Sequence, residues 1–486
     1  MDFLDPKKRK AHAIRLWVGY ALIGTALLLA TTILLYQAYG FRITRQGQII
    51  QNGLVFMSSQ PSGAAIYANG QRLSPTTNAR LSLSAGQYTF ELKRDGYRDW
   101  KRGISVEGGS VQRFVYPFLF PVDLRTTSLK QYEQLGTMLQ SSNNRWLMMQ
   151  TGADTFDVFD ASRSQPAAVP LTVPTEVLAA NTVTTGWREV EWAEDNRRVV
   201  LERSYTRAGQ AGSEYILLDR EDPARSRNIT ELLGFNPSVL SLRDGAYDSY
   251  YAFDRNSGVL FTATINEPTP APLLHGVLAF QNDGRDTILH ATNDGAAADK
   301  TLIRLYTGGN SYTVREVPRD SRYLLDIARH EGSWIITAGA QSENRVYVYQ
   351  DPQGPLRAGR VVVPVQVLRV DRPSQISFSN NARFVMVQRA GQFAVYDAET
   401  ERGYAYRITL PEGASAGTAT WMDGHRLTVV SNEELIVFDF DGTNQQTLVP
   451  ARPGYVPGFN PAYTFMYVVS PGGELTSTSL RTLQDE

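Results

Sequence analysis

Residues Leu16–Tyr39 form the one stretch of 24 residues in which no side chain is charged. As an α-helix this stretch is about 36 Å long, enough to cross a hydrocarbon core of about 30 Å with some tilt. A chain with such a segment places everything that follows it on one side of a membrane. We therefore expect a short tail at residues 1–15, a transmembrane helix at 16–39, and all later domains on the other side.

Basic residues flank the apolar segment unequally. Arg42 and Arg45 follow it closely, whereas five basic residues precede it. These membrane-orienting residues are Lys7, Lys8, Arg9, Lys10 and Arg15. An excess of Lys and Arg keeps its side of the membrane cytoplasmic. We expect a single-pass cell-membrane protein with a cytoplasmic N-terminus and extracytoplasmic C-terminal domains. A basic run also occurs in nuclear import signals, but here it adjoins a membrane span and is interpreted as a tail that binds lipid headgroups.

The alternative to an anchor is a cleavable signal peptide. A signal peptide has an apolar core of about 7–15 residues that ends at a cleavage site with small side chains. Here the apolar core is much longer, and its end carries the aromatic residues Tyr36 and Tyr39. The pattern therefore predicts an uncleaved anchor.

The chain has 486 residues, a formal net charge of −1 and no cysteine. The absence of cysteine excludes disulfides, thiolate metal sites and cysteine nucleophiles. A net charge near zero argues against a nucleic-acid partner, which requires clustered Lys and Arg. An exported domain of this size without disulfides is more typical of a bacterial or archaeal cell surface than of a eukaryotic one.

After a short linker at residues 40–53, the pattern changes to the period of two that β-strands show. Leu54–Ser59 is a strand candidate, and Asn69-Gly70 predicts a two-residue hairpin turn. Tyr88, Phe90 and Leu92 share one face of a further strand. We expect a compact antiparallel β-sandwich over residues 54–122.

This region resembles the PEGA domain. The residues that carry the resemblance are Ser59–Ala64, Tyr67–Gly70, Gly86–Tyr88, Gly96-Tyr97 and Trp100. Where that family often has Gly-x-Thr-Pro after the hairpin, this chain has Leu73–Thr77 and needs a different turn. The resemblance implies a spacer or surface-interaction module, because no catalytic residue belongs to the motif. The aromatic stretch Phe114–Pro121, bounded by prolines, is interpreted as a packed connection to the next domain.

A repeated phrase occupies residues 123–486: an aromatic residue, a polar turn, an apolar strand, and a second strand that ends in Asp. The clear copies are Trp192–Leu201 with Glu214–Asp219, Phe378–Val387 with Phe393–Asp397, and Trp421–Val430 with Leu435–Asp439; weaker copies start near Asn143, Tyr251, Leu278, Asp326 and Phe459. The spacing of about 40 to 50 residues predicts a β-propeller of seven or eight blades. The alternative is a pair of β-sandwiches. Short first and last copies suggest that the N- and C-terminal strands of this region share a closing blade.

The phrase Trp-Ala-Glu-Asp-Asn-Arg-Arg-Val-Val, at residues 192–200, resembles the TolB-like and WD-type repeat. The tryptophans at repeat positions are interpreted as core residues between blades rather than as a sugar-binding groove. They are Trp187, Trp192, Trp334 and Trp421.

Catalytic motifs are absent from the sequence. It has no His-Glu-x-x-His, no Gly-x-Ser-x-Gly and no phosphate-binding loop. Asp439–Asn444 starts like a calcium loop but lacks its later acidic residues, so we interpret it as a turn. The carboxylate pairs Glu189/Glu191 and Glu433/Glu434 are interpreted as structural or solvated, because a glycosidase requires two carboxylates that face each other across a pocket. We expect no catalytic, cofactor-binding or metal-binding residues, and no residue pattern marks a ligand site.

The sequence thus predicts a mainly β protein of the cell envelope that binds or scaffolds. An N-terminal helix holds a PEGA-like domain and a propeller outside the membrane. The expected partners are the lipid bilayer, through the helix, and an envelope protein or glycan, with no nucleic acid and no cofactor. The alternative is an envelope enzyme, a lyase or glycosidase, with its site in the propeller channel.

Overall fold

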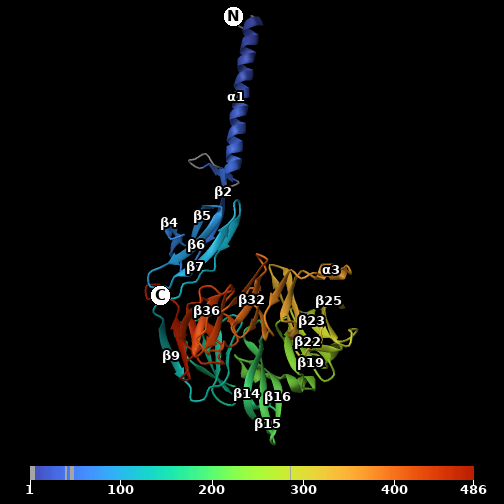
Figure 1. Ribbon diagram of the computed structural model, residues 1–486. Helices are drawn as coiled ribbons and strands as arrows, with labels where there is room; N and C mark the ends of the chain where they lie inside the picture. The colour runs from blue at the N-terminus through green and yellow to red at the C-terminus, as the bar shows by residue number, and fades with distance from the viewer. Residues whose placement is uncertain (1–5, 39–40, 44–48, 285, 486) are drawn as a thin grey trace. The chain divides into compact units, whose positions relative to one another are not determined.

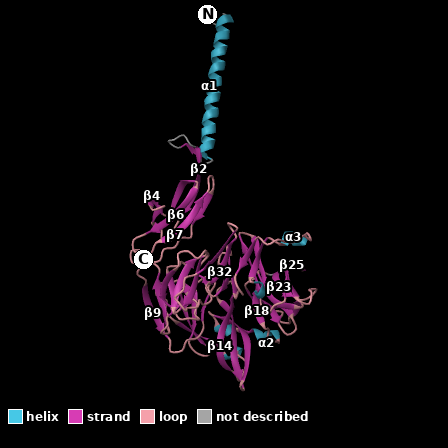
Figure 2. Ribbon diagram, viewed as in Figure 1, coloured by secondary structure: helices cyan, strands magenta, loops and turns pink. Residues whose placement is uncertain are grey.

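In the computed structural model the chain forms two compact units, residues 1–123 together with 481–486, and residues 124–480 (Figure 1). The protein is mainly β, with one long helix (Figure 2). The residues that the structure describes are 6–38, 41–43, 49–284 and 286–485.

The long helix, α1 (Pro6–Ala38), contains the expected apolar segment. Within it, His12–Tyr36 is long and apolar enough to cross a membrane, and none of it is buried in the protein. Thr25 and Thr32 each donate a hydroxyl hydrogen bond to the backbone carbonyl four residues earlier, which satisfies the only polar groups of these side chains. The backbone of the basic residues 7–10 also lies in α1, although their side chains lie outside the described part of the structure.

The β-domain of the first unit contains two four-stranded sheets. One contains β1 (Phe41–Ile43), β2 (Ile49–Met57), β5 (Ala79–Ser84) and β8 (Val111–Phe114); the other has the order β4 (Gln71–Thr76), β3 (Ala65–Ala68), β6 (Gly86–Lys93) and β7 (Trp100–Val106). Phe90, Leu92 and Trp100 lie at the centre of its core, each no more than 1% exposed. The pairing is antiparallel except between β2 and β8, which run parallel. The hairpin turn predicted between β3 and β4 is confirmed, because Asn69 and Gly70 both have the positive φ that it requires.

The second unit contains eight four-stranded antiparallel sheets among its described residues, so the propeller has eight blades. Blade 1 comprises β10 (Met138–Gln140), β11 (Trp146–Gln150), β12 (Thr155–Asp160) and β13 (Val169–Thr172), and blade 2 comprises β14 (Val183–Trp192), β15 (Arg198–Arg207), β16 (Gln210–Asp219) and β17 (Arg227–Asn228). Blade 3 comprises β18 (Val239–Arg243), β19 (Ala246–Asp254), β20 (Val259–Thr264) and β21 (Ala271–Leu274), and blade 4 comprises β22 (Val277–Asn282), β23 (Thr287–Thr292), β24 (Lys300–Thr307) and β25 (Asn310–Pro318).

The remaining blades follow the same order along the chain. Blade 5 comprises β26 (Tyr323–His330), β27 (Ser333–Ala340), β28 (Arg345–Gln350) and β29 (Gln366–Arg369), and blade 6 comprises β30 (Gln375–Phe378), β31 (Phe384–Arg389), β32 (Gln392–Asp397) and β33 (Arg402–Arg407). Blade 7 comprises β34 (Thr420–Trp421), β35 (Arg426–Ser431), β36 (Glu434–Asp439) and β37 (Gln446–Pro450), and blade 8 comprises β38 (Gly458–Phe459), β39 (Phe465–Val469), β40 (Glu474–Ser479) and β9 (Arg125–Gln131). Two short helices, α2 (Ile229–Leu233) and α3 (Gln353–Arg357), lie in connections.

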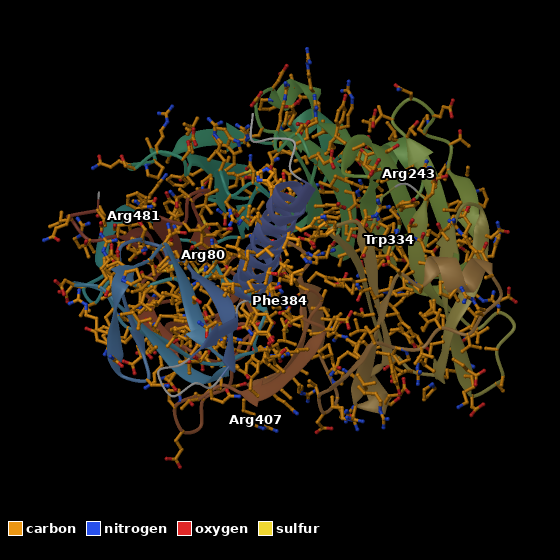
Figure 3. All side chains as sticks on the ribbon, turned by 90° about the horizontal axis from the view of Figure 1, so that it is seen from above. Arg80, Arg243, Trp334, Phe384, Arg407 and Arg481 are labelled. Atoms are coloured by element: carbon orange, nitrogen blue, oxygen red, sulfur yellow. The ribbon has the colours of Figure 1, made fainter. Side chains whose placement is uncertain are left out.

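The blades pack side by side into a ring that closes between blade 8 and blade 1. Figure 3 labels Arg243 of blade 3, Trp334 of blade 5 and Phe384 of blade 6. Separate apolar clusters join blades 1 and 2, 2 and 3, 3 and 4, 4 and 5, and 5 and 6. A further cluster joins blade 8 to blade 1, with Tyr467 on β39 against Leu147 on β11. The expected shared closing blade is confirmed, because β9 from the start of the region pairs with β40 from its end, Arg125 opposite Ser479. Ring closure identifies a propeller rather than two β-sandwiches.

Strand direction gives the propeller two distinct faces. Because neighbouring strands are antiparallel, the first and third strands of every blade end on the same face, which we call the junction face. The connections at residues 123–125 and 479–481, which lead to the other unit, lie on this face. The hairpins between second and third strands lie on the opposite face, which we call the hairpin face. Figure 1 shows α3 and the β15–β16 hairpin at these two ends of the propeller.

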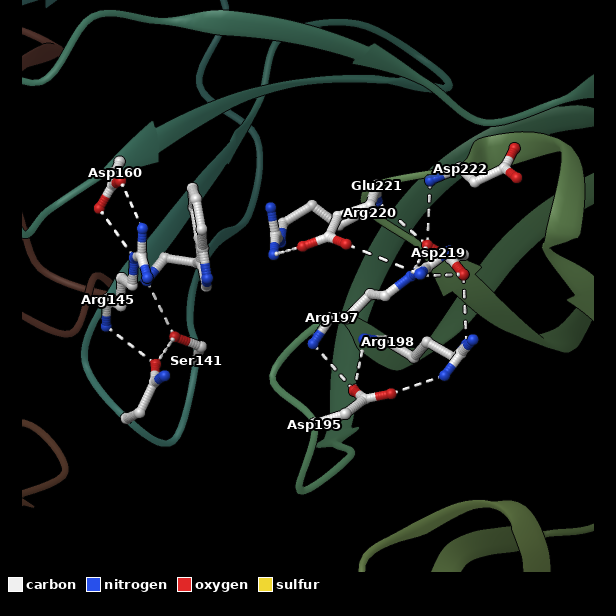
Figure 4. Close-up of polar contacts among 12 residues, drawn as sticks. Ser141, Arg145, Asp160, Asp195, Arg197, Arg198, Asp219, Arg220, Glu221 and Asp222 are labelled. Atoms are coloured by element: carbon white, nitrogen blue, oxygen red, sulfur yellow. Dashed lines mark hydrogen bonds and ion pairs between the residues drawn. The ribbon is translucent and has the colours of Figure 1, made fainter.

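The repeated phrase has a physical basis on the junction face. Its turn carries an arginine before the second strand, and the third strand ends in the aspartate that this arginine meets. The pairs are Arg145–Asp160 at 3.1 Å, Arg197–Asp219 at 2.7 Å and Arg383–Asp397 at 2.8 Å. The same aspartates accept backbone N–H bonds from the residues that follow them. Each pair therefore joins the two turns of one blade (Figure 4 shows the first two).

The last residues of the chain belong to the first unit, although the sequence analysis grouped them with the propeller. The carboxylate of Asp485 pairs with Arg94 and accepts a hydrogen bond from the Tyr97 hydroxyl at 2.6 Å. The backbone N–H of Thr482 donates to the same hydroxyl oxygen at 3.1 Å. Charge-assisted bonds of this kind hold the tail against the turn after β6.

Candidate functional site

The innermost strands of the propeller carry acidic side chains that connect one blade to the next. On β14, Glu191 accepts a hydrogen bond from the backbone N–H of Leu242 in blade 3 at 2.8 Å. Glu189 on the same strand accepts one from the backbone N–H of Gln140 in blade 1. On β26, Asp326 accepts backbone N–H bonds from its own strand and from Phe378 in blade 6. These carboxylates thus hold neighbouring blades together around the channel.

Amide side chains make the same kind of connection. Gln140 binds both backbone groups of Phe459, with its Nε2 donating to the carbonyl at 2.6 Å and its Oε1 accepting from the N–H at 3.1 Å. Asn282 donates to the carbonyl of Leu242 at 3.2 Å, and Gln375 donates to that of Ala419 at 2.9 Å. Most polar side chains of the innermost strands are therefore engaged in structure.

Burial changes the protonation of these acids. It raises the pKa of Glu189 to about 7 and that of Asp326 to about 7, because a partly desolvated carboxylate is disfavoured relative to its neutral form. Burial also raises the pKa of Glu191. The hydrogen bonds that these carboxylates accept lower the pKa values but do not offset the desolvation.

The two carboxylate pairs noted in the sequence do not form catalytic pairs across a pocket. A bulge between Glu189 and Glu191 shifts the register of β14, and the two side chains bond to different neighbouring blades. Glu433 and Glu434 are exposed at the turn between β35 and β36, on the hairpin face. Neither pair supplies an acid and a base to one space.

A cavity of about 630 Å³ opens at the junction-face end of the inner strands. Turns and strand ends of blades 3 to 6 line it, and its main polar and aromatic groups are Asp244, Asp283, Asp286, Arg329, Phe378 and Asn380. We call it the channel-mouth cavity. Its volume falls in the range typical of small-molecule and side-chain binding sites. Phe378 and Asn380 belong to a clear copy of the repeat, whereas the sequence signal for the three aspartates was only an acidic turn after an apolar strand.

Ion pairs partly balance the charge of this cavity. Arg329 lies 3.6 Å from Asp283, too far for a hydrogen bond, and Arg243 lies 3.1 Å from Asp286. Burial raises the pKa of Asp283, and the nearby charge of Asp244 adds to this effect. The cavity thus offers carboxylates, a guanidinium, an amide and one aromatic ring to a ligand.

A second, smaller cavity of about 260 Å³ lies beside Trp146 in blade 1. The guanidinium of Arg220, from blade 2, lies 3.6 Å from the centre of the Trp146 ring, and that of Arg145 lies 4.8 Å away. Burial lowers the pKa of Arg220. Burial acts to raise the pKa of Asp160, but bonds from Arg145 and Ser162 outweigh it and bring the value to about 2. These contacts connect blades 1 and 2 rather than form an evident reaction centre.

The other residues noted in the sequence have structural positions. Trp187, Trp192 and Trp334 are buried within the clusters between blades, and Trp421 stacks on Phe384 of blade 6. The Asp439–Asn444 segment is a turn closed by its own hydrogen bonds, with the Asn444 amide donating to Asp439 at 2.8 Å. Among the described residues, no group of three His, Cys, Asp or Glu side chains is placed to hold a metal ion.

The comparisons with known proteins identify one family. Residues 52–118 match the PEGA domain family. The PEGA domain thus includes β3 to β8 and most of β2, and the residues that suggested it from the sequence lie within it. A search of curated protein sequences found no match to the chain.

Solved structures similar to this chain include several propellers and propeller-containing proteins. Kluyveromyces lactis Hsv2 is 9% identical, with a TM-score of 0.40 over 66% of this chain and 98% of its own. The β-propeller domain of Myceliophteria thermophila Cps50 (Swd1) is 9% identical, with a TM-score of 0.38 over 74% of this chain and all of its own. The dihydro-heme d1 dehydrogenase NirN is 13% identical, with a TM-score of 0.41 over 65% of this chain and 66% of its own.

Proposed function

We propose that this protein is a membrane-anchored binding or scaffold protein of a bacterial cell envelope, which displays its propeller outside the membrane to a protein or glycan. The observation that carries the binding role is the channel-mouth cavity, a space of about 630 Å³ lined by carboxylates, a guanidinium, an amide and an aromatic ring. A PEGA domain and a propeller together suggest a surface or interaction protein.

The helix α1 supports the proposed location in the membrane. Its span His12–Tyr36 has no part buried in the protein, so its apolar side chains need another apolar environment. The basic residues Lys7 to Lys10 precede this span and Arg15 lies near its start, and by the charge rule they support a cytoplasmic N-terminus. The PEGA domain and the propeller are then extracytoplasmic.

The hydrogen bonds that the inner carboxylates accept support binding without catalysis. Glu189, Glu191 and Asp326 accept backbone hydrogen bonds that hold blades together, and a carboxylate engaged in this way is poorly placed to transfer a proton to a substrate. We propose that the protein is not an enzyme.

A capture experiment tests the binding role. The full chain in detergent micelles is incubated with solubilised envelope fractions and with envelope glycans, beside the variant Ala328→Trp, which fills the channel-mouth cavity. The matched control is Ala405→Trp, at an exposed position on the outer strand of blade 6. We expect one retained partner or glycan that Ala328→Trp loses and Ala405→Trp keeps. Retention of nothing, or equal retention by both variants, would contradict the proposed site.

One observation favours the competing function, an envelope lyase or glycosidase. The pKa of Asp283 is raised by burial, as in a general acid, and Asp244 and Asp286 line the same cavity. Turnover of envelope glycans by the native chain, lost in Asp283→Asn with folding intact, would support the enzyme. Absence of turnover with retained glycan binding supports the scaffold.

A further inference from the structure

Blade 5 exposes an apolar segment in the connection between its third and fourth strands. This segment, residues 357–365, begins at the last residue of α3, and we call it the valine loop. Val361 is 91% exposed and Val363 is 78% exposed, which makes them the two most exposed large apolar side chains of the described propeller. Adjacent, strongly exposed apolar residues on a surface often mark an interaction site.

The exposure of these valines is built into the loop. Val362, between them, packs against the apolar cluster of blades 4 and 5, as does the buried Leu356 of α3. The backbone N–H of Val365 donates to the carbonyl of Val348 at 2.8 Å, which fixes the end of the loop. Because the side chain of Val362 is held against the core, Val361 and Val363 on either side of it point outward together.

Basic residues accompany the exposed valines. Arg357 and Arg360 are both exposed, and the described residues between 357 and 365 include no acidic side chain. Exposed apolar residues flanked by arginines are the combination that binds the interface of a bilayer with anionic lipids, since the apolar groups enter the acyl boundary and the guanidinium groups contact headgroups.

The valine loop also lies on the face of the propeller at which the chain connects to the other unit. It connects β28 to β29, a third strand to a fourth, and so belongs to the junction face. The chain connects the propeller to the PEGA domain and α1 from the same face, at residues 123–125. On the hairpin face, by contrast, Val183 is 67% exposed at the start of β14.

We propose that the valine loop is a second membrane contact, in which Val361 and Val363 enter the interface of a bilayer that contains anionic lipid. This inference rests on the proposed anchoring by α1, which brings the propeller near a membrane. The loop then limits the orientations of the propeller and directs the junction face, with its channel-mouth cavity, towards the lipid surface.

The absence of cysteine from the chain allows a direct test. The variant Val363→Cys is labelled with an environment-sensitive fluorophore, and the full chain is placed in nanodiscs that contain anionic lipid and a headgroup-linked quencher. Val183→Cys is the matched control on the hairpin face, and Leu28→Cys in α1 is the control for anchoring. We expect quenching and a blue-shifted emission at positions 363 and 28, and neither at 183.

Second variants test the chemistry of the contact. Val361→Asp in the Val363→Cys chain should abolish the quenching at position 363. Arg360→Gln should lower the ratio of inserted to free loop about five-fold in anionic discs, which is the contribution of one arginine near an anionic surface. It should have little effect in zwitterionic discs.

The controls separate the two proposals. No quenching at position 28 would overturn the anchoring itself. Quenching at 28 without quenching at 363 would overturn only the lipid contact of the valine loop. A blue shift at 363 in nanodiscs that occurs without quenching by the headgroup-linked quencher would also overturn it, since that result indicates a protein surface, such as a second copy of the chain, over the loop.

Discussion

The substitution Glu189→Gln gives a specific test of the structural role of the inner acids. Burial raises the pKa of Glu189 from its ordinary value of 4.5 to about 7. Between these two values the folded chain holds the proton more tightly than the unfolded chain, so the free energy of unfolding falls as pH rises through this window. Above pH 7 the ionised, partly buried carboxylate destabilises the fold. Gln has no charge, and its side-chain oxygen still accepts the hydrogen bond from Gln140.

The magnitude follows from the size of the pKa change. A rise from 4.5 to about 7 corresponds to at most about 3–4 kcal/mol at about 1.4 kcal/mol for each tenfold change. Because Glu189 is only partly buried, we expect about 2 kcal/mol in practice. Glu189→Gln should therefore raise the free energy of unfolding by about 2 kcal/mol at pH 8 and leave it nearly unchanged at pH 4.

The assay is urea unfolding in detergent micelles, followed by tryptophan fluorescence, with wild type and variant compared at each pH. The control is Glu434→Gln, at an exposed position on the hairpin face, which should show no difference at either pH. Destabilisation by Glu189→Gln at pH 8 would refute the reasoning, because it would mean that the ionised carboxylate has a cationic partner. An equal effect at both pH values would also refute it.

Two further predictions concern a buried ion pair in blade 2 and the C-terminal tail. Arg203 and Glu214 form a buried pair at 2.6 Å in blade 2, so Arg203→Met should lower the free energy of unfolding by about 3–5 kcal/mol, and adding Glu214→Leu should recover part of the loss in the same unfolding assay. The bonds from Tyr97, Thr482 and Arg94 lower the pKa of Asp485, so they stabilise the tail fully above the ordinary aspartate pKa, and this contribution is lost as pH falls through the lowered pKa of the folded chain. Asp485→Asn should accordingly speed amide exchange at Thr482 at neutral pH, with an effect that shrinks as pH falls below the ordinary aspartate pKa, and unchanged exchange at neutral pH would contradict the docking of the tail.

Much of the propeller can be predicted from sequence because its signals are local. Each blade repeats an apolar strand, a polar turn and a strand that ends in Asp, and these periodicities predict hairpins directly. The pairing of Arg383 with Asp397 connects residues 14 apart within one such unit, and both were visible as part of the phrase. The sequence suggests that one copy of the phrase starts near Tyr251, which lies on β19, the second strand of blade 3. The blade itself starts one strand earlier, at β18, and that strand lacks the aromatic residue of the phrase.

The site could not be predicted because it depends on contacts between blades. The channel-mouth cavity combines Asp283 with Arg329 and Phe378, three residues that come close only once blades 4, 5 and 6 have packed side by side. A single bulge in β14 turns Glu189 and Glu191 towards different blades, and a bulge has no reliable sequence signature. The return of the tail to the first unit depends on a few polar contacts, which leave no periodic pattern in the sequence.

The central claim is that α1 is an uncleaved membrane anchor and that the propeller lies outside the membrane. Cysteine accessibility in intact cells tests it directly, because the wild-type chain has no cysteine to interfere. The variants Val183→Cys and Asp2→Cys are exposed to a membrane-impermeant maleimide before and after permeabilisation. The account predicts that position 183 is labelled in intact cells and position 2 only after permeabilisation. Labelling of position 2 in intact cells, or its absence from the mature chain, would contradict the account.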